Sequence, residues 1–351
     1  MVKQLPKILI VYSGGTIGMI HDPENNMLKP FDFSQITEEV PELNKIKCEI
    51  DAISFENPID SSNINTTIWE KIGNLIWDKF EKYDGFVVLH GTDTMSFTAS
   101  ALSFMFVNLN KPIIFTGSQL PIGTVRTDGK ENLITAIEIA ADKKNGNPVV
   151  QEVAIYFEYQ LYRANRTTKI SSEHFDAFKS FNYPPLAEAG ININYSYSNL
   201  LVPIEKKVEY FSGFDASIST IVFFPGITID HLIHQFNNPK IKILVLLTYG
   251  SGNLPLNNQL INVIRKQIKK GKIIINLSQC VAGKVDQSKY ETGRQLESAG
   301  VIGAEDMTFE ALISKSMLLL KKYKKVEQVS KMILMPISGE ISSFEAGFLK
   351  E

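Results

Sequence analysis

The chain has 351 residues, 44% of them hydrophobic and 21% charged, which is ordinary for a soluble globular protein of one large or two smaller domains. Its formal net charge of -2 at pH 7 gives no reason to expect nucleic acid or an anionic membrane as a partner. Two cysteines, Cys48 and Cys280, exclude a disulfide framework and a Cys-x-x-Cys zinc site. We find no secretory signal and no long apolar span, and expect a cytoplasmic protein.

The first half of the chain alternates short apolar runs with helical patterns. Apolar runs bounded by turn residues are typical of buried parallel strands, and they predict strands at 8–11, 86–89, 113–115 and 153–156. Helices are predicted at 66–83, 95–106 and 133–141. The polar stretch 21–26 is expected to be a loop. This alternation predicts an α/β fold with a doubly wound, mostly parallel sheet.

The second half of the chain again alternates predicted strands and helices, after an interruption. Between about 191 and 215 the sequence becomes rich in Tyr, Asn and Ser, which predicts a linker. Strands are then predicted at 221–224, 243–247 and 274–277, with helices at 260–269 and 309–323. We therefore expect a larger domain over 1–190, a linker over 191–215 and a smaller α/β domain over 216–351.

A glycine-rich turn, YSGGTIGM at residues 12–19, follows the first predicted strand. It is not a phosphate-binding P-loop, because no Lys follows Gly18. As a dinucleotide fingerprint it is imperfect, because Ser13 occupies the first glycine position. The remaining alternative is a tight turn whose glycines relieve steric strain, but that alternative does not explain why the turn presents Thr16.

A second turn, HGTDTM at residues 90–95, follows another predicted strand. In open α/β sheets ligands bind at the carboxyl ends of strands, so Thr16, Thr92 and Asp93 could share one site. The alternative for Thr92 and Asp93 is helix capping, which both residue types favour. His90 is interpreted as a strand-end histidine, because the other histidines share no metal-ligand spacing with it.

A threonine nucleophile needs a base, because its hydroxyl is weak at its own pKa. The sequence shows no Gly-x-Ser-x-Gly elbow and no Ser-His-Asp arrangement. A lysine can serve instead when it is buried, and Lys169 in the run RANRTTK (163–169) is the candidate. Composition alone would assign Lys169 to the solvated surface.

Taken together, these motifs resemble the L-asparaginase family, in particular its cytoplasmic, type I bacterial branch. The resemblance covers nearly the whole chain and rests on several motifs in order. Besides the two turns and the lysine run, they are DSSN (60–63), FDAF (175–178), GSQLP (117–121), YGSGN (249–253), SQC (278–280) and GVIG (300–303).

The resemblance implies hydrolysis of L-asparagine to L-aspartate and ammonia through an acyl-enzyme, without metal or cofactor. Thr16 would attack the amide carbon from a mobile turn. Thr92, Asp93 and Lys169 would form a rigid second triad, with Lys169 as base and Asp93 also holding the substrate ammonium. Both motifs supply a threonine, so which one forms the covalent bond is open.

The substrate α-carboxylate would be held by Ser61 and Ser62, and backbone N–H groups near Thr92 would bind the oxyanion. The resemblance adds Gly15, Asp60 and Gly91 to the substrate-binding residues.

Asn253 would reach into a neighbouring subunit's site, which implies a dimer or a dimer of dimers; the alternative is a left-handed turn residue. Some type I enzymes bind a second asparagine at a regulatory site, which Ser118, Thr168 and Cys280 match in part. Packing is the simpler interpretation of Cys280.

Two departures from the family pattern concern the first turn. The family carries a Tyr about a dozen residues past the nucleophile, but residues 25–28 read Asn-Asn-Met-Leu and no Tyr lies between Tyr12 and Tyr83. The turn also begins Tyr-Ser rather than the commoner Tyr-Thr, which keeps a hydroxyl at Ser13. A tyrosine lid over Thr16 is therefore not expected.

Four alternatives to an asparaginase remain. They are a broader glutaminase, a tRNA-dependent amidotransferase subunit, a non-catalytic amino-acid sensor and a nicotinamide dehydrogenase. The near-neutral charge and the absence of extra length count against the amidotransferase subunit. The intact set of Thr16, Thr92, Asp93 and Lys169 counts against the sensor, and Ser13 counts against the dehydrogenase.

Overall fold

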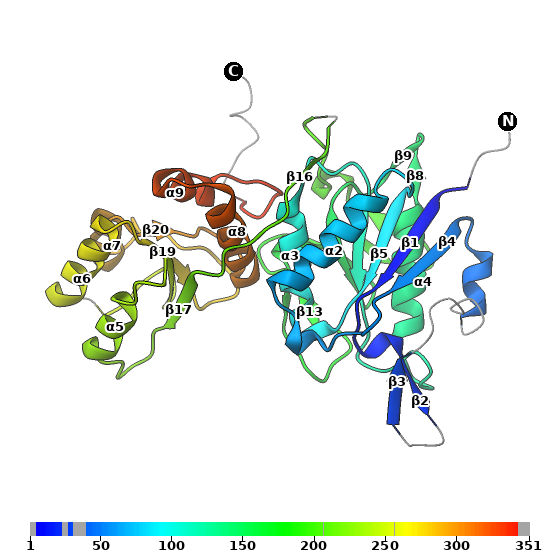
Figure 1. The fold of residues 1–351 in the computed structure, drawn as a ribbon, viewed down its shortest axis with the longest axis horizontal. Helices are drawn as coiled ribbons and strands as arrows, with labels where there is room; N and C mark the ends of the chain where they lie inside the picture. Colours follow the sequence, from blue (N-terminus) through cyan, green and yellow to red (C-terminus); the bar gives the residue numbers. More distant parts are fainter. Residues whose placement is uncertain (1–4, 23–26, 31–39, 206, 256, 343–351) are drawn as a thin grey trace. The chain divides into compact units, whose positions relative to one another are not determined.

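The computed structural model describes residues 5–22, 27–30, 40–205, 207–255 and 257–342. The chain divides into unit 1, Met1–Ser212, and unit 2, Gly213–Glu351. Both units are α/β, as the alternation of strands and helices predicted (Figure 1).

Unit 1 is built on an eight-stranded sheet with the order β15-β14-β11-β10-β7-β5-β1-β4. Its parallel strands are β1 (Lys7–Tyr12), β4 (Glu49–Ser54), β5 (Gly85–Leu89), β7 (Ile113–Thr116) and β10 (Val153–Phe157). Three antiparallel strands extend it, namely β11 (Gln160–Arg163), β14 (Ala187–Ala189) and β15 (Ile193–Tyr195). The four strands predicted in the first half are confirmed, and the sheet is mostly parallel.

Helices cover both faces of this sheet. Figure 1 shows α2 (Thr66–Lys79) and α3 (Met95–Met105) on one face and α4 (Gly129–Ala141) on the other. The predicted apolar stripe of α2 is buried in the core: Trp69, Ile72, Ile76 and Phe80. Each such side chain stabilises the fold by about 1.5–3 kcal/mol on burial. The helix starts at Thr66 because the Asn65 side chain accepts hydrogen bonds from the first free backbone N–H groups.

The strand order reverses beside β1. After β1 the chain goes to β4 on one side of it and then returns to β5 on the other side. Ligand sites of open α/β sheets lie at such a reversal, outside the carboxyl ends of the strands. The turn with Thr16 follows β1 and the turn with Thr92 follows β5, so both candidate motifs lie where this rule places a site.

Two sequence expectations for unit 1 differ from the structure. The stretch 21–26, expected to be a loop, begins as β2 (Met19–Asp22), which pairs with β3 (Met27–Pro30); residues 23–26 lie outside the described residues. The expected linker 191–215 contains β15 and also β16 (Glu209–Tyr210), which pairs with β6 (Phe106–Val107), and unit 1 extends to Ser212. Strands this short lack the apolar runs by which buried strands are recognised.

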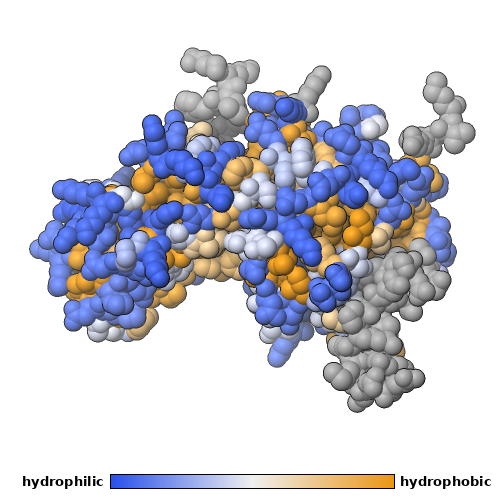
Figure 2. Space-filling view, viewed as in Figure 1, coloured by the Kyte–Doolittle hydropathy of each residue, from blue (hydrophilic) through white to orange (hydrophobic). Residues whose placement is uncertain are grey.

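Unit 2 contains a parallel four-stranded sheet of β17 (Ile218–Val222), β18 (Ile243–Thr248), β19 (Ile273–Ser278) and β20 (Ile302–Gly303). Its helices are α5 (Ile229–Phe236), α6 (Asn258–Lys269), α7 (Glu291–Ala299), α8 (Phe309–Lys322) and α9 (Val326–Leu334). The core between them is mostly aliphatic, with Phe223 and Phe236 as its buried aromatic residues. Figure 2 shows a largely hydrophilic surface over α5, α6 and α7, as expected of helices with one buried face.

Short elements complete the fold. The remaining paired strands are β8 (Lys143–Lys144) with β9 (Asn147–Pro148), and β12 (Thr168–Lys169) with β13 (Phe178–Lys179). The 3-10 turns are η1 (Thr16–Gly18), η3 (Pro41–Lys45), η4 (Ser61–Asn63), η5 (Thr92–Thr94), η6 (Ala164–Arg166) and η7 (Tyr197–Asn199). No helix in the described ranges is long and apolar enough to cross a membrane.

Candidate active site

The two glycine turns meet backbone to backbone. Gly15 has a φ of 91°, and a Cβ on it would lie 2.4 Å from the Gly91 backbone N. Only glycine combines that φ with so close an approach. The Ser13 hydroxyl donates to the Leu89 carbonyl at 2.9 Å, which ties the end of β1 to the end of β5. Thr16 and Thr92, each next to one of the touching glycines, are thereby brought to one place.

The DSSN turn packs against the same backbone. A Cβ on Gly91 would lie 2.6 Å from the Ser61 hydroxyl oxygen. The Asp60 carboxylate accepts hydrogen bonds from the backbone N–H and the hydroxyl of Ser62, both at 2.9 Å. These bonds lower the pKa of Asp60. All three turns of the predicted site therefore converge at the carboxyl edge of the sheet.

Thr16 begins η1 and is half-buried. Tyr12 packs against this turn, and its hydroxyl donates to the Gly15 carbonyl at 3.3 Å. Burial raises the pKa of the Tyr12 phenol. Gly18 lies against the Tyr12 ring, where a Cβ would come within 2.2 Å of a ring carbon. Gly15 and Gly18 thus let the backbone of this turn pack closely against its neighbours. This packing explains their spacing, which matches two of the three glycines of a dinucleotide fingerprint.

Lys169 joins the second turn. Its Nζ donates to Thr92 Oγ1 at 2.7 Å and forms an ion pair with Asp93 Oδ1 at 2.6 Å. The Lys169 side chain is 16% exposed and that of Asp93 is 62% exposed, so the pair opens to solvent on the carboxylate side. The capping alternative does not hold, because neither η5 nor α3 has a side-chain capping hydrogen bond.

Gln119 is a site residue whose role was not predicted. Thr92 Oγ1 donates to Gln119 Oε1 at 3.4 Å, and Gln119 Nε2 donates to the His174 carbonyl at 3.1 Å. Both carboxylate oxygens of Asp128 accept the Gln119 backbone N–H, and burial raises the pKa of Asp128. The GSQLP motif marked this segment, but nothing in the sequence singled out the glutamine side chain.

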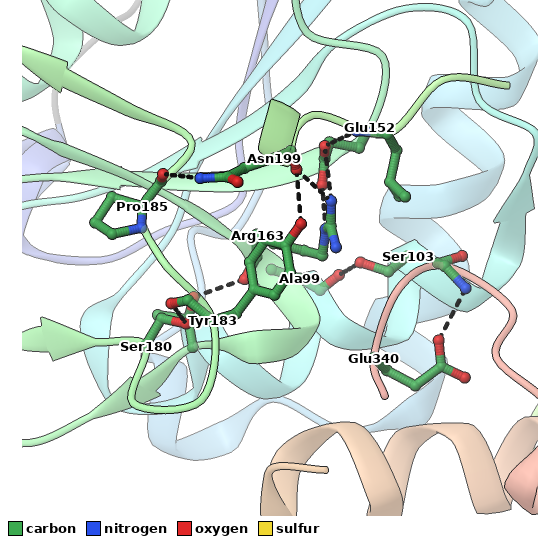
Figure 3. Close-up of polar contacts among 12 residues, drawn as sticks. Ala99, Ser103, Glu152, Arg163, Ser180, Tyr183, Pro185, Asn199 and Glu340 are labelled. Atoms are coloured by element: carbon green, nitrogen blue, oxygen red, sulfur yellow. Dashed lines mark hydrogen bonds and ion pairs between the residues drawn. The ribbon is translucent and has the colours of Figure 1, made fainter. Parts of the chain in front are cut away.

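A buried ion pair anchors the segment that carries Lys169. Arg163, at the end of β11, donates to Glu152 at 2.6 Å and to the Asn199 carbonyl at 2.8 Å (Figure 3). Its guanidinium lies 4.3 Å from the centre of the Tyr183 ring, whose hydroxyl also donates to the Asn199 carbonyl. These contacts fix the strand end six residues before Lys169.

Replacing Glu152 by Gln should strongly destabilise the protein. Arg163 and Glu152 are each at most 4% exposed, so the variant leaves a buried guanidinium without its counter-charge. Losing one partner of a buried pair costs about 3–5 kcal/mol. Denaturant unfolding measures this loss, and Glu49→Gln, which breaks an exposed pair with Lys7, is the control expected to change little. Equal effects of both variants would contradict the assigned role of burial.

His90 is a buried strand-end histidine, as predicted. It is 1% exposed, and burial lowers its pKa to about 4. Its ring nitrogens contact the Gly91 carbonyl at 2.7 Å and the Thr98 hydroxyl at 2.9 Å. Among the described residues no group of three or more His, Cys, Asp or Glu side chains could hold a metal ion.

His90 should make stability depend on pH between about 4 and 6.5. In that range the unfolded chain binds a proton that the native histidine does not, so the free energy of unfolding rises with pH. Urea titrations from pH 4 to 7 should show a shallower rise for His90→Asn than for the wild type. Parallel profiles for the two proteins would show that this histidine does not cause the dependence.

The other predicted site residues lie in both units. In unit 1, Ser118 is buried and donates to the Leu120 carbonyl at 2.5 Å, and Thr168 precedes Lys169 in β12. In unit 2, the Asn253 side chain accepts from the Thr292 hydroxyl at 2.6 Å, and Cys280 is exposed, not packed in the core.

The left-handed alternative for Asn253 is wrong. In its turn the positive φ values belong to Gly250 and Gly252, and Asn253 is not among the non-glycine residues with positive φ. Residues 25 and 26 of the stretch 25–28, which lacks the family tyrosine, lie outside the described residues.

Comparison with known proteins identifies the family of this chain. The family model for asparaginase, N-terminal, matches residues 7–201, and that for the glutaminase/asparaginase C-terminal domain matches 217–333. L-asparaginase 1 of Escherichia coli K12 is 38% identical over 340 residues, which cover 97% of this chain and 99% of that protein.

Two solved structures are also similar. L-asparaginase I from Vibrio cholerae is 37% identical, with a TM-score of 0.86 over 96% of this chain and 99% of that one. The thermostable L-asparaginase from Thermococcus kodakarensis is 30% identical, with a TM-score of 0.87 over 96% of this chain and 100% of that one. With both family models matched and a relative aligned along its whole length, this chain belongs to the asparaginase family.

Proposed function

We propose that this protein hydrolyses L-asparagine to L-aspartate and ammonia. The observation that carries the proposal is the contact of one lysine, Lys169, with both the Thr92 hydroxyl and the Asp93 carboxylate, beside the turn that bears Thr16. A hydroxyl, an amine and a carboxylate within hydrogen-bond reach are what amide hydrolysis by a threonine nucleophile requires. L-asparaginases are also the relatives that align along the whole chain.

In the first half of the reaction, Thr16 Oγ1 attacks the side-chain amide carbon of asparagine. An ester bond to the enzyme forms, the carbon–nitrogen bond breaks, and the nitrogen leaves as ammonia after receiving the proton that the Thr16 hydroxyl has given up. The developing oxyanion needs N–H donors, which the start of η5 at Thr92 can supply because the first N–H groups of a helix have no acceptor within it.

In the second half, water attacks the ester carbon, the bond from that carbon to the Thr16 oxygen breaks, this oxygen regains a proton that comes from the water, and aspartate is released. Lys169, when it has lost a proton, can accept the Thr92 proton across the 2.7 Å contact, and Thr92 in turn can take a proton from the water. Thr92 could instead carry the ester itself, since it is the threonine in direct contact with the base. The assignment of the ester to Thr16 rests on the family resemblance.

The polar groups around these residues suit a zwitterionic substrate. Asp93 is more than half exposed and offers a carboxylate to the substrate ammonium. Ser61, Ser62 and the backbone at Gly15 and Gly91 would face the α-carboxylate. The Ser62 hydroxyl is bonded to Asp60 in the free protein and would exchange that bond for the substrate.

We also propose a cytoplasmic homo-oligomer. Cys48 and Cys280 are both free, which suits a reducing compartment. Asn253 would complete the site of a neighbouring subunit, as the family resemblance implies. Regulation by a second asparagine at Ser118, Thr168 and Cys280 is part of the same expectation. Sedimentation equilibrium of the wild type, and a Hill coefficient for asparagine with and without Thr168→Ala, test these statements.

Ammonia release from L-asparagine and from L-glutamine tests the activity itself. We expect turnover of asparagine and a much smaller kcat/KM for glutamine. Binding of asparagine by calorimetry without ammonia release would indicate an amino-acid sensor instead. Comparable kcat/KM for the two amides would indicate a broad glutaminase-asparaginase.

A further inference from the structure

Behind the second turn lies a chain of buried hydrogen bonds that involves none of the proposed catalytic side chains. Trp69 Nε1 donates to Thr98 Oγ1 at 3.1 Å, Thr98 Oγ1 contacts His90 Nε2 at 2.9 Å, and His90 Nδ1 contacts the Gly91 carbonyl at 2.7 Å. Thr98 is fully buried, and Trp69 and His90 are nearly so. The chain ends on the peptide bond that precedes Thr92.

The direction of each bond follows from which atoms can donate. An indole N–H only donates, and a peptide carbonyl only accepts. His90 Nδ1 must therefore carry the proton that bonds Gly91, and a neutral imidazole then has Nε2 as an acceptor. Burial keeps the ring neutral, with its pKa lowered to about 4. Thr98 must donate to Nε2 at 2.9 Å in preference to the Thr94 carbonyl at 3.3 Å.

The direction of these hydrogen bonds fixes the orientation of the Gly91–Thr92 peptide. The structure contains no cis peptide bond within the described residues, so in this plane C=O and N–H point in opposite directions. Holding the Gly91 oxygen against the buried imidazole holds the Thr92 N–H on the opposite side. A Cβ on Gly15 would also come within 2.6 Å of the Gly91 Cα, at which this peptide begins, so a tilt of the plane would also disturb the turn of Thr16.

We propose that His90, set in its tautomer by Thr98 and Trp69, is a positioning residue that aims the Thr92 backbone N–H at the reacting carbonyl oxygen. This inference rests on the proposed amide hydrolysis. These bonds have only one arrangement of donors and acceptors, and they involve the hydroxyl of neither Thr16 nor Thr92. It would therefore affect the stabilisation of the oxyanion more than the binding of asparagine.

A matched pair of variants tests the last bond. His90→Leu removes the donor to Gly91 at similar volume, and His90→Asn keeps an N–H near the position of Nδ1. Complete loss of an oxyanion donor costs about 100- to 1,000-fold in kcat, and a misaimed donor is expected to cost about tenfold. We expect His90→Leu to lower kcat about tenfold and to change KM less than twofold. His90→Asn should recover most of the lost kcat.

A second pair tests the middle of the chain. Thr98→Val removes the hydroxyl without changing the shape, and Thr98→Ser restores it. We expect kcat to fall several-fold only in the valine variant. Thr135→Val, which removes a buried hydroxyl bonded to Glu131 on α4, is the control that should leave kcat unchanged. Equal kcat for Thr98→Val and Thr98→Ser, or a loss confined to KM, would overturn the proposal.

The tautomer of His90 can be determined without measuring activity. Nitrogen-15 spectra of the resting protein should show His90 with a protonated Nδ1 and an unprotonated Nε2, and His90→Leu should shift the Thr92 amide resonance. A proton on Nε2, or an unmoved Thr92 resonance, would overturn the inference whatever the turnover. If the wild type released no ammonia, the proposed function would fail, and these spectra would still decide the hydrogen-bond chain.

Discussion

Replacing Lys169 by Met is expected to lower kcat for asparagine by about 1,000-fold or more, since members of a nucleophile–base set act as a unit. Lys169 is the residue that joins Thr92 and Asp93, at 2.7 and 2.6 Å. Methionine keeps much of the length of the side chain but cannot carry a proton. The loss should appear in kcat with a smaller change in KM. Initial rates of ammonia release over a range of asparagine concentrations measure both constants.

Lys179 supplies the control for this variant. It lies on β13 in the same two-stranded pair as Lys169, and it pairs at 3.6 Å with the exposed carboxylate of Asp176. Lys179→Met should retain nearly full activity, because no candidate site residue contacts its Nζ. Wild-type kcat in Lys169→Met, with thermal unfolding unchanged in both variants, would remove Lys169 from the mechanism.

Thr16→Ala is the second variant with a large expected effect. If Thr16 is the nucleophile, its loss should lower kcat by about 1,000-fold or more while asparagine still binds, because the groups for the ammonium and the carboxylate remain. Thr92→Val should have a comparable effect for a different reason, namely loss of the proton path to Lys169. Rates alone will therefore not separate the two roles.

Trapping the covalent intermediate separates them. Wild-type protein quenched in acid during turnover should gain the mass of an aspartyl group, and peptide mapping should locate it on Thr16. Thr92→Val should still acylate, and deacylation should become the slow step. An adduct on Thr92 in the wild type, or on Thr92 in Thr16→Ala, would assign the ester to Thr92.

The sequence predicted that the two glycine turns lie together, because the features that show this are local. Apolar runs and the turns behind them identify β1 and β5, and the carboxyl ends of neighbouring parallel strands meet at one edge. The glycines of the first turn also had a local reason, since Gly15 needs a positive φ and contact with Gly91. Strand order could not be predicted from these runs, and it is the order that places β1 beside β5.

Contacts between distant segments could not be derived from composition or periodicity. Lys169 is 77 residues from Thr92, and composition alone assigned it to the surface; only the family resemblance grouped it with Thr92 and Asp93. Gln119 lies 27 residues from Thr92 and was marked only by its motif. The strands β15 and β16 inside the expected linker were missed for a related reason, because they pair with strands whose position the sequence does not reveal. The position of His90 at a strand end was correctly predicted, but its hydrogen-bond partners were not.

One measurement tests the central claim most directly: steady-state ammonia release from L-asparagine by the wild type, Thr92→Val, Lys169→Met and the double variant. We predict turnover by the wild type, a loss of about 1,000-fold or more in each single variant, and no further loss in the double variant, because the two residues act through one hydrogen bond. Multiplicative losses in the double variant, or an inactive wild type, would contradict a Thr92–Lys169 site for asparagine hydrolysis.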